Sequence, residues 1–117
     1  MDINKIIDQL RAHPDFPKMG MIASHLGIVR GTSLNGREVK EIEVEFHQDK
    51  IDAIAKNIKA LPGIFEVLIK TFGGRLKVGD EIMFVAVGGD IRDHVFPALV
   101  ETVNRIKKEG TAKKEIF

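Results

Sequence analysis

One apolar run, residues 82–87, constrains the fold of this chain more than any other part of its sequence. Successive side chains of a strand point to opposite faces of a sheet, so Ile82, Phe84 and Ala86 share one face and the alternate residues share the other. A strand that is apolar on both faces is typical of a sheet that is covered on both sides. The run therefore predicts a central buried strand, entered from a tight polar turn at residues 77–80.

A helix is predicted shortly after this strand. Two glycines and a charged cluster come first, and apolar residues at helical spacing follow: Phe96, Leu99, Val100, Val103 and Ile106. Proline is tolerated in the first turn of a helix, so Pro97 predicts a start close to Asp93. Gly110 is a typical helix terminator, and residues 111–117 are expected to form a short basic tail.

The other elements are predicted from the same two periodicities. A first helix begins near Ile3 and is stopped by His13-Pro14. The elements that follow are a strand over 21–30, a hairpin-like connection at Asn35-Gly36, a strand over 39–46, a helix over 51–61 capped by Asp49, and a strand over 65–69. In the strand over 39–46, apolar residues alternate with three glutamates, so one face is expected to meet the core and the other to meet water.

Length and composition narrow the class of protein. The chain has 117 residues, which suffice for one compact domain with a single core. Its net charge of +1 argues against a general nucleic-acid-binding protein, because neutralising phosphates needs a clustered excess of cations. It has no cysteine and its four histidines show no metal-ligand spacing, so we expect neither a disulfide nor a metal site. It shows no secretion signal and no apolar stretch of membrane-spanning length, so a cytoplasmic protein is expected.

Four lysines flank one predicted turn and form the first candidate site. Lys107 and Lys108 precede Gly110, and Lys113 and Lys114 follow it, so a chain reversal at the glycine would bring the two pairs together. Crowded ammonium groups attract anions, and their mutual repulsion favours a lysine that transfers protons or acts as a nucleophile. The alternative is a solvated helix end whose cations only compensate the helix dipole.

Two arginines are candidates for binding an anion. Arg30 ends a predicted strand between Gly27 and Gly31, and its guanidinium suits a phosphate or carboxylate. Arg92 lies close to a helix start, where backbone amides add to its charge. The alternatives are a surface carboxylate as the partner of Arg30 and an ion pair of Arg92 with Asp90 or Asp93.

Taken in order, several motifs resemble the MoaE family, the large catalytic subunit of molybdopterin synthase. Gly27-Ile28-Val29-Arg30 is similar to the family's Gly-x-Val-Arg, and residues 74–80 are similar to its Gly-x-Leu-x-x-Gly-Asp/Glu turn. The apolar run then leads to Arg92 and Phe96, and the chain closes with Ile106-Lys107 and Lys113-Lys114-Glu115. The similarity covers nearly the whole chain after about residue 19.

This resemblance implies a fold, a reaction and partners. The fold is a single α/β hammerhead-type α+β domain over residues 1–117, with a helix and loop in 1–18 and a core of mixed or antiparallel sheet packed with helices in 19–117. The reaction transfers sulfur from the thiocarboxylate of a small subunit to cyclic pyranopterin monophosphate (precursor Z) and forms molybdopterin, with no cofactor. The partners are a second copy of the chain, in a homodimer within a heterotetramer, and a ubiquitin-like sulfur carrier that ends in Gly-Gly.

The resemblance also assigns roles to individual residues. Lys107 corresponds to one catalytic lysine and either Lys113 or Lys114 to the second, while Arg30 and Arg92 correspond to arginines that hold the anionic substrate. The chain departs from the family where two His-Arg pairs are replaced, one by Thr71-Phe72 and one by Ile91-Arg92. The retained lysines favour a molybdopterin synthase. The missing histidines favour the alternative, a non-catalytic MoaE-like binding or assembly module.

Overall fold

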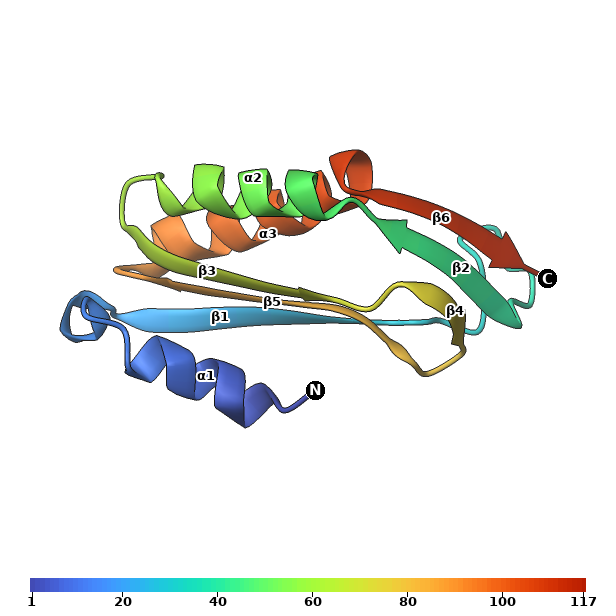
Figure 1. The fold of residues 1–117 in the computed structure, drawn as a ribbon, viewed down its shortest axis with the longest axis horizontal. Helices are drawn as coiled ribbons and strands as arrows, with labels where there is room; N and C mark the ends of the chain where they lie inside the picture. Colours follow the sequence, from blue (N-terminus) through green and yellow to red (C-terminus); the bar gives the residue numbers. More distant parts are fainter.

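The computed structural model describes residues 1–117 as three α-helices, one 3₁₀-helix and six strands (Figure 1). Their order is α1 (Ile3–Arg11), η1 (Phe16–Lys18), β1 (Met21–Ile28), β2 (Glu41–Phe46), α2 (Gln48–Lys59), β3 (Ile64–Thr71), β4 (Gly74–Lys77), β5 (Glu81–Gly89), α3 (Arg92–Glu109) and β6 (Thr111–Ile116). All strand pairs are antiparallel. The predicted α+β class, with antiparallel sheet packed against helices, is confirmed.

The strand predicted from the apolar run is the centre of the first sheet, whose order is β1-β5-β3. Every residue of β5 from Met83 to Gly89 is buried. β1 pairs with it from Met21 opposite Gly89 to Ile28 opposite Glu81. The prediction of a central buried strand is therefore confirmed, and the two neighbouring strands satisfy its backbone hydrogen bonds on both sides.

Helices cover both faces of this sheet, which explains why both faces of β5 are apolar. Figure 1 shows α2 and α3 on one side of the sheet and α1 on the other. Val85 and Val87 belong to the main core, which α2 and α3 complete through residues such as Ile54 and Ile106. On the opposite face, Phe84 and Ala86 pack with Ile6 and Leu10 of α1 in a smaller cluster.

A second antiparallel sheet, of order β4-β2-β6, extends beyond one end of the first (Figure 1). The alternation predicted for β2 is confirmed, because Ile42 and Val44 are buried while Glu43 and Glu45 are exposed. β4 was not anticipated, and the prediction of a short basic tail after Gly110 was wrong. Residues 111–116 form strand β6, which pairs with β2 along its whole length.

Two local predictions need correction. The turn at Asn35-Gly36 is a hairpin only locally, with Thr32 bridged to Glu38, because β1 and β2 belong to different sheets. Asp49 does not cap α2: the N-cap residue is His47, and Asp49 lies in the first helical turn. In that turn its carboxylate still lies near the positive end of the helix dipole.

The predicted core stripe of α3 is partly wrong. The helix starts at Arg92, close to the expected position, and Pro97 lies inside it. Val103 and Ile106 are buried as expected, but Phe96 is 52% exposed and Val100 is 58% exposed. The buried face instead includes Val95, Ala98 and Thr102, whose hydroxyl donates a hydrogen bond of 2.7 Å to the Ala98 carbonyl oxygen.

No helix of the structure has the length and apolar character needed to span a membrane.

Candidate functional site

A cavity of about 790 Å³ opens where the two sheets and the end of α3 meet. Its apolar lining comes from β1 and the segment that follows it, and from β2 and β5, which contribute Ile42, Phe46, Ile82 and Met83. Its charged lining consists of Arg30 just after β1, Lys107 at the end of α3, and Lys113 and Glu115 on β6. Three cations therefore surround an apolar floor together with a single carboxylate, and such a site favours an anion that also carries an apolar part.

The reversal at Gly110 brings Lys107 and Lys113 to this cavity. The Gly110 amide donates to the Ile106 carbonyl oxygen at 3.0 Å, and the Gly110 carbonyl accepts from the His47 amide at 2.9 Å. A Cβ at this position would lie 2.7 Å from Cδ1 of Ile51, so a larger residue would have to displace this side chain of α2, and glycine suits the close packing. The Thr111 hydroxyl also donates to the Ile106 carbonyl oxygen at 2.7 Å. The expected chain reversal is therefore present, and it is fixed on both sides.

The strand register separates the two lysines that the sequence left as alternatives. Lys113 pairs with Val44 and Lys114 pairs with Glu43, so the two lysine side chains leave β6 on opposite faces. Thr111, Lys113 and Glu115 share the face that lines the cavity. Within this chain, Lys107 therefore has Lys113, and not Lys114, as its neighbour in the cavity.

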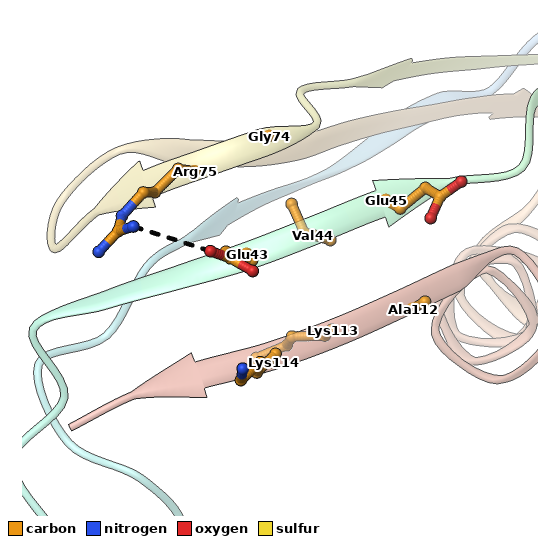
Figure 2. A pocket seen from close by; sticks show the side chains of 8 residues that line it. All are labelled: Glu43, Val44, Glu45, Gly74, Arg75, Ala112, Lys113 and Lys114. Atoms are coloured by element: carbon orange, nitrogen blue, oxygen red, sulfur yellow. Dashed lines mark ion pairs between the residues drawn. The ribbon is translucent and has the colours of Figure 1, made fainter.

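Lys114 lies on the outer face of the second sheet, where charges of both signs alternate. Figure 2 shows this shallow hollow, of about 460 Å³, with Glu43, Arg75 and Lys114 around it. Arg75 forms ion pairs with Glu41 and, at 3.8 Å, with Glu43. Lys113 borders this hollow as well as the cavity, because a single layer of sheet separates the two. The carboxylates here compensate the cations, so this face is a less suitable anion site than the cavity.

The cations of the cavity have no carboxylate partner within ion-pair distance. Arg30 Nε donates to the carbonyl oxygen of Thr32 at 2.8 Å, a contact that orients the guanidinium. The seven ion pairs of the structure include none with Arg30, Lys107 or Lys113. The alternative in which Arg30 meets a surface carboxylate is thus not observed. Cations without an ion-pair partner are available to form charge-assisted hydrogen bonds with an anionic ligand.

His25 is a further cavity residue, and the sequence reasoning did not select it. It lies on β1 opposite Val85 of β5, and its Nε2 atom is buried without a hydrogen-bond partner. Burial, and secondarily the charge of Lys107, lower the pKa of this imidazole below its ordinary value. The sequence did contain a signal for His25 as a site residue. In a strand, His25 and Gly27 share one face, and this face leads to the candidate Arg30.

Arg92 does not join the other site residues within one chain. It is the first residue of α3 and is exposed, whereas Lys107 lies in the last turn. The separation is about 22 Å along the helix axis, from a rise of roughly 1.5 Å per residue. The expected alternative, an ion pair of Arg92 with Asp90 or Asp93, is also not observed.

Asp90 has another partner instead of Arg92. Its Oδ1 lies 2.8 Å from Nδ1 of His94 and accepts a hydrogen bond from the Ile91 amide at 2.6 Å. The His94 contact is the main cause, and the amide contact a lesser one, of a lowered pKa for the Asp90 carboxyl. These contacts fix the start of α3 and leave the Arg92 guanidinium free.

Comparisons with known proteins agree on one family. The family model described as MoaE protein matches residues 1–109, a range that includes Lys107 and ends before β6. A curated relative from Haloferax volcanii, described as a probable molybdopterin synthase, is 26% identical over 113 residues. That match covers 92% of this chain and 43% of the relative, so the chain spans less than half of the relative's length.

Two solved structures are similar in sequence as well as in fold. The molybdopterin biosynthesis MoaE protein from Burkholderia ambifaria is 30% identical, with a TM-score of 0.79 over 100% of this chain and 78% of that chain. Molybdopterin synthase from Staphylococcus aureus is 25% identical, with a TM-score of 0.73 over 86% of this chain and 76% of that chain.

Proposed function

This chain belongs to the MoaE protein family, and we propose that it acts in molybdenum cofactor biosynthesis as the catalytic subunit of a molybdopterin synthase. The proposed reaction moves sulfur from the C-terminal thiocarboxylate of a small ubiquitin-like subunit to cyclic pyranopterin monophosphate, and forms molybdopterin. One observation carries the proposal: Lys107, Lys113 and Arg30 line the same cavity, and none of them has an ion-pair partner.

The cavity suits the chemistry of such a substrate. A cyclic phosphate needs fixed cations, and the Arg30 guanidinium, oriented by the Thr32 carbonyl oxygen, can supply two parallel donors to it. A flat pterin ring needs an apolar surface, which Phe46 and Ile82 offer. We assign substrate binding to Arg30 on this basis.

Sulfur transfer needs groups that move protons and stabilise negative charge. The thiocarboxylate sulfur attacks a carbon of the substrate, and the bond from that carbon to an oxygen breaks as the oxygen leaves with a proton. Water then cleaves the acyl–sulfur bond, which leaves sulfur on the pterin and a carboxylate on the small subunit. The dithiolene of molybdopterin needs two sulfurs, so these steps occur twice, each time with a fresh thiocarboxylate. No electrons are gained or lost in these two steps. Lys107 and Lys113 are suited to donate protons to the leaving oxygen and to stabilise the tetrahedral intermediate of the cleavage.

The proposal includes a homodimer in which Arg92 serves the other copy's cavity. Within one chain Arg92 is at the far end of α3 from Lys107, so it can help to hold the substrate only from a second molecule. Support comes from the apolar side chains on the same helix, since Phe96 and Val100 are both more than half exposed. A dimer contact through α3 would cover them.

The test is a reconstitution with purified components. The protein is mixed with precursor Z and a thiocarboxylated small subunit, and molybdopterin is measured for the wild type and for Lys107→Ala. We expect product from the wild type and its loss in the variant. If the wild type binds the small subunit and makes no product, the chain is a non-catalytic MoaE-like binding module. If neither binding nor product is found, the proposed function is wrong.

A further inference from the structure

His25 has the position of a ligand-binding residue, although the motifs of the sequence do not mark it. It lines the cavity beside Lys107, and the Cβ of an alanine at position 27 would lie 3.6 Å from its Nε2. The imidazole therefore leans along β1 toward Gly27 and the Arg30 end of the cavity. Its Nε2 is the one buried side-chain nitrogen or oxygen of the chain without a hydrogen-bond partner. Such an atom at the wall of a cavity is a place where a ligand can supply the missing partner.

The charged groups around His25 are almost all cations. Lys107 faces it from α3, and Lys113 and Glu115 face the same cavity from β6. Arg30 lies just after the end of β1, the strand that carries His25. On β5 the apolar Val85 and Met83 lie on this face, and Glu81 of the same strand does not line the cavity. The cavity residues of β2 are the apolar Ile42 and Phe46. Burial, and secondarily the Lys107 charge, lower the pKa of the imidazole and so favour its neutral form. An anion bound beside Lys107 compensates the lysine charge and offers a hydrogen-bond acceptor, and both effects favour the protonated imidazole.

We propose that His25 is an additional anion-binding residue of this cavity, and that its imidazole takes up a proton when a phosphate-type anion binds beside Lys107. This inference rests on the proposed function, since it concerns the phosphate of the same substrate. The protonated ring donates a hydrogen bond to an anion oxygen through the nitrogen that is now unpaired. Rotation about χ2 of a histidine is only weakly restricted, so the ring can turn this nitrogen into the cavity.

Sulfate is the probe that tests the inference, because it remains a dianion across the range in which histidine titrates. Histidine is the side chain whose ordinary pKa lies between about pH 5.5 and 8, so His25 is the cavity residue expected to make sulfate binding depend on pH. We expect sulfate to bind the wild type about tenfold more tightly at about pH 5.5 than at about pH 8, because proton uptake is linked to binding. Calorimetric titration at each pH measures this ratio.

Two variants and one control isolate His25. His25→Gln keeps a hydrogen-bonding side chain without a titratable proton, and His25→Phe keeps an aromatic ring of similar shape. Both are expected to bind sulfate with an affinity that is independent of pH. His47→Gln is the matched control, because His47 lies outside the cavity and makes no side-chain cap hydrogen bond. It is expected to retain the wild-type ratio.

A direct measurement follows the imidazole itself. In the wild type, the NMR titration of the His25 ring protons is expected to shift to higher pH when sulfate is added, while the His47 titration stays in place. A wild-type affinity that does not change with pH, an unshifted His25 titration, or a pH dependence that survives in His25→Gln would each overturn the inference.

Failure of this inference is distinguishable from failure of the proposed function. Molybdopterin formation with pH-independent sulfate binding overturns the role of His25 and leaves the synthase intact. Proton-linked sulfate binding in a protein that makes no molybdopterin supports the role of His25 and removes the proposed reaction. Absence of sulfate binding at every pH overturns the inference, whatever the activity.

Discussion

Among single residues, the two lysines of β6 offer a sharp comparison. Lys113 and Lys114 are adjacent, carry the same charge and are both exposed, yet they leave the strand on opposite faces. We expect Lys113→Ala to lower molybdopterin formation by at least about 100-fold, the usual effect of losing a proton-transferring group. Lys114→Ala is the matched control and is expected to stay within about twofold of the wild type, since it removes an equal charge from the outer face.

Rates are measured in the reconstituted assay, and thermal unfolding confirms that both lysine variants fold. Equal losses in Lys113→Ala and Lys114→Ala would show that net charge matters, and not the face of the strand.

His25 predicts how stability changes with pH. Its pKa in the folded protein lies below the ordinary histidine value of 6.5, so the unfolded chain binds more protons as the pH falls past that value. The wild type should therefore lose stability relative to His25→Gln as the pH is lowered through 6.5, and the difference should level off below the folded-state pKa. Urea unfolding of both proteins at several pH values measures this difference. A constant difference across the range would contradict the expectation.

Gly63 is required by both its backbone and its neighbours. Its φ is +78°, and a Cβ would lie 2.2 Å from Nδ1 of His94 and 2.4 Å from Oδ1 of Asp90. Gly36 has a similar φ of +86° with no atom within 4 Å of the Cβ position. We expect Gly36→Ala to lower the free energy of unfolding by about 1–2 kcal/mol, the cost of a left-handed conformation.

Gly63→Ala should cost clearly more than that, because it adds a clash with the Asp90–His94 pair. Urea unfolding of the two variants separates the cost of conformation from the cost of the clash. Similar losses in Gly63→Ala and Gly36→Ala would show that the pair moves aside easily.

Among the elements, the ones predicted correctly are those whose apolar pattern decides their burial. β5 was found because both of its faces are apolar, and α1 because its apolar residues follow the helical period. β4 and β6 were missed because residues such as Arg75, Lys113 and Lys114 are polar and carry no apolar alternation. Their backbone pairing with β2 stabilises them, and this contact is distant in the sequence. The buried face of α3 was misjudged because Phe96 and Val100 are apolar and yet exposed.

The position of α1 predicts that its packing affects stability and not chemistry. Leu10 is 0% exposed and packs with Phe84 on the face of the first sheet that is opposite to α2 and α3. Leu10→Ala should lower the free energy of unfolding by about 2–5 kcal/mol, through lost burial and a cavity. Molybdopterin formation by the folded variant should remain close to that of the wild type.

Ile3→Ala is the control for Leu10→Ala, because Ile3 is 38% exposed on the same helix. It should change stability much less. A strong loss of activity in folded Leu10→Ala would show that α1 affects the cavity.

In the whole molecule, the candidate site depends on contacts that no local pattern reveals. Arg30 and Lys107 could be named from the sequence because each belongs to a short motif. They lie together because the end of β1, the end of α3 and the strand β6 converge. Of these contacts, the sequence predicted only the chain reversal at Gly110 that joins α3 to β6. The same contacts exclude Lys114 from the cavity and separate Arg92 from it within one chain.

The exposed apolar side chains of α3 lead to a prediction about assembly. If two copies meet through this helix, Val100→Asp should convert a dimer into monomers, since a buried unpaired carboxylate is costly at an interface. Sedimentation velocity of the variant and the wild type measures the change. Val78→Asp is the control, because Val78 is 48% exposed and lies at the β4–β5 turn, away from α3. A wild type that is monomeric at all concentrations would remove Arg92 from the proposed site.

Because β6 pairs with β2 as a regular strand, alternate residues of β6 face the cavity, and this alternation decides which lysine lies there. A related chain with one residue more or fewer between Gly110 and the lysines would exchange the faces on which Lys113 and Lys114 lie. A lone lysine would then be lost from the cavity, whereas two in succession always leave one there. Two adjacent lysines thus keep one lysine in the cavity after an insertion or deletion of one residue. A sequence alignment by column therefore does not identify the lysine that faces the cavity. That lysine is identified by whether the number of residues between it and Gly110 is odd or even.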